Sequence, residues 1–294
     1  MLKHRLTFGP LMIALLIGSF WLDEQLAGLS VGISDWTFPR GIVLMVVGVV
    51  LCAGATLELK RILRACGVLT SRRVLLAASI SGLLVPWLVS PGVNPLTAVA
   101  LTASVATGVL VSALLWHART RTPRGAAAAG GAALLSFVYL GLMFGFILAL
   151  RREHSAWVVL GVLVVTKSCD IGAFFTGTLI GKHKLIPWLS PGKTWEGLVG
   201  GIIVAAGMGA FAVWLLHLSD AGAAEPLLTW QHGALFGGLF AFIGQAGDLM
   251  ASMLKRDAGI KDSGAVLPGF GGVLDIIDSL LPVAPLAYWL LHVP

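Results

Sequence analysis

The sequence predicts an all-α integral membrane protein with about nine transmembrane helices. Of its 294 residues, 57% are hydrophobic and only 12% are charged, whereas soluble domains carry about 25% charged residues. The apolar residues form blocks of roughly 15 to 25 residues, the length that crosses a bilayer. Because backbone in lipid must satisfy its own hydrogen bonds, we expect these blocks to be helical.

The segments expected to span the membrane follow one another along the whole chain. They lie at residues 8–22, 40–57, 74–90, 95–116, 126–150, 156–180, 197–217, 233–250 and 279–293. The first, eighth and ninth are short, near the lower limit for crossing about 30 Å of hydrocarbon. The first segment has a basic start, as a signal peptide does, but Asp23 and Glu24 follow at once. We therefore expect a retained anchor.

The basic residues between these segments predict the topology. If every segment spans, sixteen of the twenty Lys and Arg residues fall on one side: Lys3, Arg5, Lys60, Arg61, Arg64, Arg72, Arg73, Arg119, Arg121, Arg124, Lys182, Lys184, Lys193, Lys255, Arg256 and Lys261. The positive-inside rule places this side in the cytosol of a bacterial-type inner membrane and the carboxyl terminus outside. The net charge of +6 therefore reflects the basic residues of the predicted cytosolic loops. We expect no nucleic-acid partner.

Acidic residues inside the predicted spans are confined to the second half of the chain, and the first half has none in its membrane core. They are Asp170 in the sixth segment, with Lys167 one turn before it, and Asp248 at the end of the eighth; Asp275 and Asp278 follow where the ninth begins. Intramembrane charges are costly, so each is a candidate for function. The pattern divides the chain into a scaffold of about five helices, residues 1–150, and a catalytic region, residues 151–294.

Asp248, Asp275 and Asp278 are the candidate metal ligands. Without equal cationic partners at membrane depth, three carboxylates would repel one another unless a cation lies between them. The spacing of three places Asp275 and Asp278 on one helix face, and Asp248 shares a helical stripe with Ser252 and Arg256. Such a site suits Mg²⁺, which keeps several waters and completes its shell with substrate phosphates.

Cations and glycines near these acids match a phosphate ligand. They are Lys255, Arg256, Lys261, Gly264, Gly269, Gly271 and Gly272. The cations would pair with phosphate oxygens, and the glycines would let backbone N–H groups approach an anion closely. A second patch, SPGKTWEG from Ser190 to Gly197, sets Lys193 on a turn where we expect it to meet phosphate. Metal, cations and glycines together predict phosphoryl or nucleotidyl transfer.

The segment SMLKRDAGIKDSGAVLPGFGGVLDIID, from Ser252 to Asp278, closely resembles the signature of the phosphatidate cytidylyltransferases, also called CDP-diacylglycerol synthases. Asp170 with the following Ile-Gly-Ala, the stretch GKHKL from Gly181, and SPGKTWEG are also similar to that family. The resemblance covers roughly residues 165–280 and leaves the first half of the chain without a comparable signal.

The resemblance implies the reaction of CTP with phosphatidic acid to give CDP-diacylglycerol and pyrophosphate. By similarity, Asp248 and Asp275 hold divalent metal and Asp278 assists. Catalytic or phosphate-neutralising roles fall to Lys255, Arg256, Lys261 and Lys193, and substrate contacts to Asp170, Ser190, Thr194, Ser252, Asp262, Gly271 and Gly272. The resemblance also implies a monovalent cation such as K⁺ beside the Mg²⁺, and a homodimer. The predicted topology puts these residues at the cytosolic face, where CTP is available.

Two departures from the family pattern leave other functions open. Phe270 stands where the family has His, and Ile276 stands where it has Arg. A missing Arg removes a bidentate phosphate partner, so a catalytically impaired homologue is one alternative. A second is CTP-dependent transfer to another lipid, such as an archaeol-type phosphate or a polyprenol. A third is a transporter, which the crowding of polar residues into one half disfavours.

Overall fold

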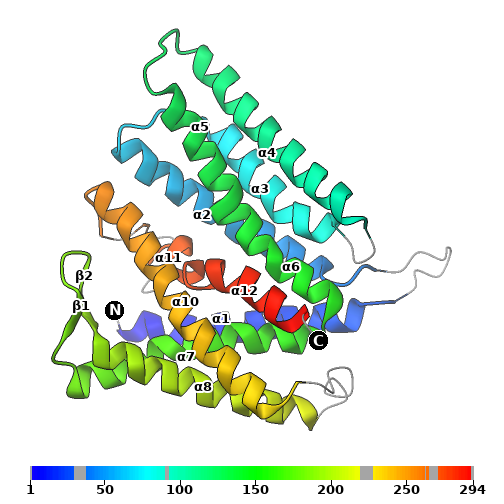
Figure 1. Ribbon diagram of the computed structural model, residues 1–294, viewed down its shortest axis with the longest axis vertical. Helices are drawn as coiled ribbons and strands as arrows, with labels where there is room; N and C mark the ends of the chain where they lie inside the picture. The colour runs from blue at the N-terminus through cyan, green and yellow to red at the C-terminus, as the bar shows by residue number, and fades with distance from the viewer. Residues whose placement is uncertain are drawn as a thin grey trace. The chain divides into compact units, whose positions relative to one another are not determined.

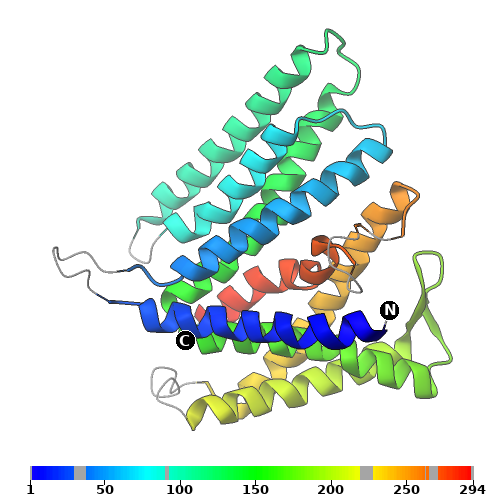
Figure 2. The same ribbon diagram turned by 180° about the vertical axis from the view of Figure 1, so that it is seen from behind.

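The computed structural model describes residues 2–29, 38–89, 93–218, 228–261, 263–264 and 271–292, with side chains from residue 9 onward. The described chain is almost entirely helical, with one short hairpin (Figures 1 and 2). Its elements are α1 (Leu2–Leu26), α2 (Ile42–Ala65), α3 (Arg72–Leu88), α4 (Pro95–Ala118), α5 (Ala126–Leu135), η1 (Ser136–Leu142), α6 (Met143–Glu153), α7 (Ala156–Ile180), β1 (Lys184–Ile186), β2 (Ser190–Thr194), α8 (Trp195–His217), α10 (Trp230–Asp257), α11 (Val273–Ile277) and α12 (Leu280–His292).

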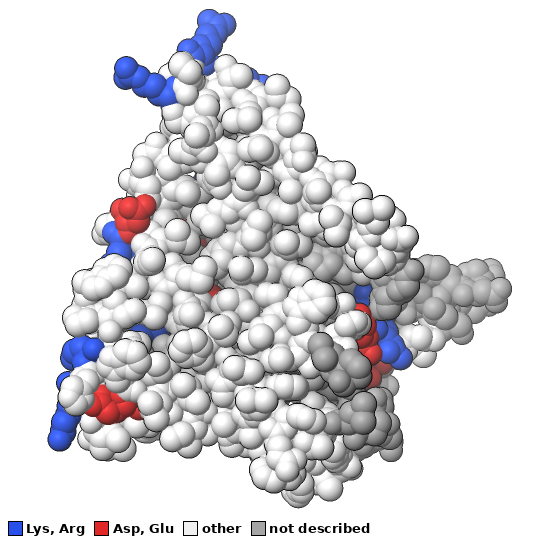
Figure 3. Space-filling view, viewed as in Figure 1, with Lys and Arg blue, Asp and Glu red and all other residues white. Residues whose placement is uncertain are grey.

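Seven helical stretches of the described chain are long and apolar enough to cross a membrane. They are Ile42–Ala65, Pro95–Ala118, Ala126–Glu153, Ala156–Ile180, Trp195–His217, Trp230–Asp257 and Val273–His292. The all-α membrane class is therefore confirmed, while the count of nine stays a prediction. The two remaining segments correspond to α1 and to α3, which has 17 residues. Figure 3 shows a face almost free of charge, with Lys and Arg gathered at its margins.

The chain forms two compact units, and neither is a single stretch of sequence. The first comprises Met1–Glu153 and Leu254–Ile277, and the second comprises His154–Met253 and Asp278–Pro294. The boundary at residue 153 lies close to the predicted division at residue 150. However, the signature segment is shared, because its part from Leu254 to Ile277 packs with the first unit.

In the first unit, small residues let the helices approach closely. A Cβ added to Gly82 on α3 would overlap the carbonyl of Phe137 on η1, and one on Gly141 would overlap the carbonyl of Ser79. Close packing of this kind replaces the hydrophobic effect as the force that joins helices in lipid. Figure 1 shows α3 beside the continuous rod of α5, η1 and α6.

The first unit contains buried acids, Asp23 and Glu58, that the sequence pattern did not indicate as candidates. Asp23 is 1% exposed; its Oδ2 accepts from Arg151 Nε on α6 at 2.6 Å and its Oδ1 from the Val43 N–H at 2.9 Å. Glu58 on α2 is equally buried. The predicted second segment ended at residue 57, whereas α2 continues to Ala65 and takes Glu58 into the core.

In the second unit, α7 and α8 lie side by side, as both ribbon views show (Figures 1 and 2). Gly172 and Gly200 permit the contact, since a Cβ on either would overlap the facing helix. The hairpin of β1 and β2 connects the two helices, with Lys184 opposite Thr194. Thr194 then begins α8 as its N-cap, accepting from the Gly197 N–H at 3.1 Å. This hairpin is an addition to the predicted all-α architecture.

Candidate functional site

A polar cavity of about 530 Å³ lies within the second unit and gathers several of the predicted residues. Its polar lining is Asp170 and Thr178 from α7, Lys193 and Thr194 from β2, and Gln245 and Asp248 from α10. These six side chains come from segments up to 78 positions apart in sequence, from Asp170 to Asp248. The fold therefore places the two family-like motifs, around Asp170 and around Ser190, close to Asp248 on α10.

Lys193 is the cation of this cavity. Its Nζ forms an ion pair with Asp248 Oδ2 and donates to Gln245 Oε1 at 2.6 Å. The Lys193 side chain is 20% exposed and that of Asp248 is 31% exposed, so a ligand reaches both. Lys193 sits on β2 of the hairpin, which limits its backbone freedom and aims the ammonium group at α10. The arrangement presents a positive charge to an anion entering the cavity.

Asp170 lines the same cavity from α7. Its Oδ1 accepts from Gln245 Nε2 at 3.4 Å, and its Oδ2 lies 3.7 Å from Lys167 Nζ. Lys167 in turn donates to Ser279 Oγ at 2.7 Å. Gln245, which sequence reasoning missed, therefore links Asp170 to Lys193. Nothing in the sequence was a reason to select Gln245, because its side chain is uncharged. Only its position three residues before Asp248 sets it apart from other glutamines.

Asp278 is buried in the second unit, where its carboxyl is a hydrogen-bonding neighbour of Asp248. Gly247 makes this approach possible, since a Cβ there would lie 2.7 Å from Pro282 Cγ. The expectation that Asp275 and Asp278 share a helix face is wrong. α11 ends at Ile277, and Asp278 lies in the turn before α12.

Asp275 belongs to a second cluster, within the first unit. Its Oδ1 accepts from Lys255 Nζ at 2.6 Å, while its Oδ2 accepts from the Gly272 N–H at 2.9 Å and lies 2.9 Å from Ser263 Oγ. Lys255 is only 8% exposed, so this ion pair is largely withdrawn from water. Glu58 completes the cluster, as its Oε2 lies 2.8 Å from the same Ser263 Oγ.

The other predicted residues are placed as follows. Ser190 begins β2 but does not line the polar cavity, and Ser252 is half-buried on α10. Arg256 and Lys261 are exposed, and Arg256 Nη1 donates to the carbonyl of Ile260 at 3.2 Å. Gly271 has a φ of +89°, a conformation that favours glycine. Asp262 and Phe270 lie outside the described residues.

Across the described ranges, no three His, Cys, Asp or Glu side chains gather as a metal site would require. Asp248 and Asp278 nevertheless form a pair of neighbouring carboxyl groups. Mg²⁺ commonly binds through one or two carboxylates, with waters and substrate phosphates as its remaining ligands. The pair therefore fits a hydrated Mg²⁺, whereas Asp275 is engaged with Lys255 in the cluster of the first unit.

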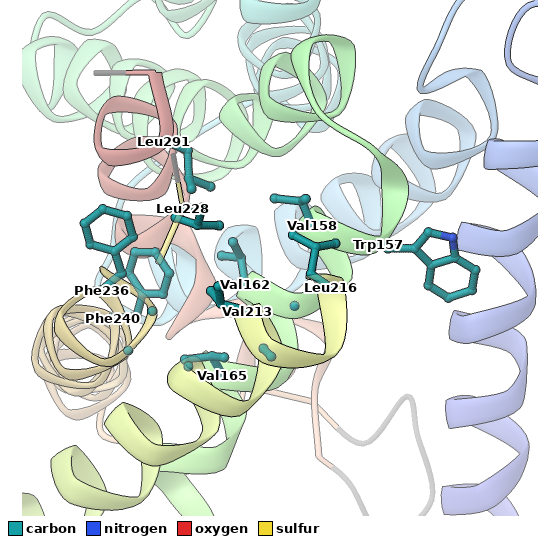
Figure 4. A pocket seen from close by; sticks show the side chains of 15 residues that line it. Trp157, Val158, Val162, Val165, Val213, Leu216, Leu228, Phe236, Phe240 and Leu291 are labelled. Atoms are coloured by element: carbon teal, nitrogen blue, oxygen red, sulfur yellow. The ribbon is translucent and has the colours of Figure 1, made fainter. Parts of the chain in front are cut away.

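A separate, apolar cavity of about 70 Å³ is lined mainly by α7, α8 and α10 of the second unit. Figure 4 shows Val162 and Val165 of α7, Val213 of α8, and Phe236 and Phe240 of α10 around it. From Asp170 to Val162 the helix rise of about 1.5 Å per residue gives a separation of about 12 Å along α7. The apolar cavity thus lies toward the other end of these helices from the polar cavity.

Long apolar helices that surround carboxylates and a lysine define an integral membrane protein with a polar site between its helices. A model of the cytidylyltransferase family matches residues 26–293. The chain therefore belongs to the cytidylyltransferase family, as the sequence motifs indicated.

Curated relatives agree with this family. The phosphatidate cytidylyltransferase of Bacillus subtilis (strain 168) is 39% identical over 159 residues, 53% of this chain and 56% of the relative. That of Helicobacter pylori is 40% identical over 149 residues, 51% and 52% of the two chains. The uncharacterized protein YnbB of Escherichia coli is 42% identical over 141 residues, 48% and 44%. The chain thus spans about half the length of the curated relatives it matches.

Proposed function

We propose that the protein transfers CMP from CTP to phosphatidic acid, giving CDP-diacylglycerol and pyrophosphate for phospholipid synthesis. The observation that carries the proposal is the polar cavity in which Lys193 meets Asp248 beside Asp170 and Gln245. Family membership and the names of the curated relatives support the same reaction. We further propose that the site faces the cytosol of the inner membrane, as the basic residues predict.

In this reaction an oxygen of the phosphatidate phosphate attacks the α-phosphorus of CTP. The bond from that phosphorus to the bridging oxygen breaks, and pyrophosphate leaves with its electron pair. The nucleophile is already anionic, so the protein has little proton transfer to perform. Its task is to hold two anionic phosphates together, because phosphoryl transfer depends mainly on positioning and electrostatic stabilisation.

The residues of the cavity divide this task between them. Lys193 neutralises phosphate charge, and Gln245 orients Lys193 through the 2.6 Å hydrogen bond. Asp248 and Asp278 would hold Mg²⁺, and we also assign Asp275 to metal binding as the family resemblance implies. When bound, the metal supplies charge neutralisation for the triphosphate. A monovalent cation and a homodimer remain part of the proposal on the same family grounds.

A lipid substrate is supported by the apolar cavity on the same helices. A phospholipid must place its phosphate beside the polar cavity while its acyl chains stay in hydrocarbon. An apolar space about 12 Å along α7 from Asp170 meets that need. Its volume of about 70 Å³ holds only a few methylene groups, so we assign it to the end of an acyl chain of the lipid substrate.

The test is release of pyrophosphate by the protein purified in detergent, with CTP and phosphatidic acid, in the presence and absence of Mg²⁺. We expect metal-dependent turnover that falls sharply, to a small residual rate, in Asp248→Asn and in Asp275→Asn. Asp257→Asn is the matched control, because Asp257 is an exposed acid at the end of the same α10. Parallel reactions with an archaeol-type phosphate and a polyprenol identify the lipid class. If turnover occurs only with one of these lipids, that lipid replaces phosphatidic acid as the proposed substrate. If no lipid supports turnover, the proposal is refuted.

A further inference from the structure

Glu58 is a buried acid whose partners all belong to the signature segment. It lies on α2 and is 1% exposed. Its Oε1 accepts from the Val273 N–H at 2.8 Å, and its Oε2 accepts from the Leu274 N–H at 2.9 Å. These two amides open α11 and precede Asp275 directly. A buried carboxylate is stable only if donors or a cation compensate its negative charge. Here the two backbone N–H groups provide that stabilisation.

Ser263 connects Glu58 to Asp275. Its Oγ lies 2.8 Å from Glu58 Oε2 and 2.9 Å from Asp275 Oδ2. A hydroxyl has one proton, so it donates to one of two ionised carboxylates at a time. Its position between them nevertheless fixes the distance from the acid of α2 to the acid of α11.

The surrounding glycines show how closely these groups are fitted. A Cβ on Gly272 would overlap Ser263 Oγ and Glu58 Oε2, so only glycine allows both contacts. On α2, a Cβ added to Gly54 would lie 3.0 Å from Val273 Cγ2. α2 therefore contacts α11 both through Glu58 and through backbone packing one turn earlier.

We propose that Glu58 is a positioning residue that holds Asp275, and through it Lys255, in the orientation the reaction uses. It fixes the two amides before Asp275 and the Ser263 hydroxyl. Lys255 binds Asp275 Oδ1, and the Gly272 N–H donates to Oδ2, the oxygen beside Ser263. Helix α2 of the first half thereby contributes directly to the geometry of the signature segment. The inference rests on the proposed function.

Glu58→Gln is the sharpest perturbation, because it keeps the shape of the side chain. One carboxylate oxygen becomes an NH₂ group, which has no lone pair to accept from the Leu274 N–H. We expect kcat to fall at least about tenfold with KM for CTP nearly unchanged, because small misplacements of reacting groups cost up to about 100-fold.

Thr56→Val is the matched structural control. Thr56 lies two residues before Glu58 on α2, is equally buried, and bonds to Cys52 O and Ser79 Oγ at 2.7 Å each. Both variants remove buried hydrogen bonds, so a loss through stability alone would affect them alike. Activities are compared per folded molecule, with the folded fraction measured by size-exclusion chromatography in detergent.

The decisive measurement adds Glu58→Gln to the Asp275→Asn background and follows residual turnover. If Glu58 acts through Asp275, its substitution has little further effect there, because interacting residues are not additive. Hydrogen exchange of the amides of Val273 and Leu274 should also rise in Glu58→Gln and not in Thr56→Val.

Three outcomes would overturn the inference: wild-type kcat in Glu58→Gln, an equal loss in Thr56→Val, or a full further loss in the Asp275→Asn background. Failure of the proposed function is distinct, because wild type itself would then turn over no CTP, and the exchange measurement would still test whether Glu58 holds α11.

Discussion

Replacing Lys193 with Met tests whether the cavity lysine binds phosphate or only stabilises the fold. Met keeps the length of the apolar stem and removes the charge. In the folded protein the change breaks the ion pair to Asp248 and the hydrogen bond to Gln245. It leaves the hairpin backbone intact, because its register depends on main-chain pairing between β1 and β2.

The two roles predict different magnitudes. Both partners of the ion pair are partly exposed, at 20% and 31%, and such pairs contribute at most about 1 kcal/mol to folding. A charge-assisted contact to a phosphate in the transition state is worth about 2 to 4 kcal/mol. That range corresponds to a loss of about 30-fold to 1,000-fold in kcat/KM. We therefore expect a large kinetic defect with a small change in thermal stability.

The assay is formation of radiolabelled CDP-diacylglycerol by purified protein over a range of CTP concentrations. Lys184→Met is the matched control, because Lys184 is an exposed lysine on β1 opposite Thr194. We expect it to stay within about threefold of wild type, as surface substitutions usually do. Near-normal kcat/KM in Lys193→Met, or an equal loss in Lys184→Met, would refute the assignment of Lys193 to phosphate.

Two further predictions concern the first unit and the apolar cavity. Asp23→Asn should lower the free energy of unfolding by about 3 kcal/mol, because it leaves the buried Arg151 without its closest counter-charge. Thermal unfolding in detergent measures this, with activity per folded molecule unchanged, and a shift no larger than in Glu24→Gln would contradict it. Val162→Phe should fill the apolar cavity and raise KM for long-chain phosphatidic acid more than for a short-chain form. The exposed Val164→Phe is its control, and equal effects on both chain lengths would exclude an acyl-chain site.

Membership of the all-α membrane class could be predicted from composition alone. Apolar blocks of bilayer length leave the backbone no other way to satisfy its hydrogen bonds. Their ends were less certain, since α2 runs eight residues past the predicted end at residue 57. Hydropathy falls where the charged residues begin, but the helix continues, and Glu58 within this extension is bound by partners from the signature segment.

The sequence by itself determined the class of the protein, its family-like motifs and the candidate acids and cations. The candidates stand out because a charge within an apolar segment is energetically costly and usually has a function. Only the tertiary structure decided which of them meet. It joined Lys193 to Asp248 and Asp170 to Gln245, separated Asp278 from the helix of Asp275, and placed Glu58 against α11. Such contacts join helices distant in sequence, and helix packing, not local spacing, sets which side chains come within a few ångströms.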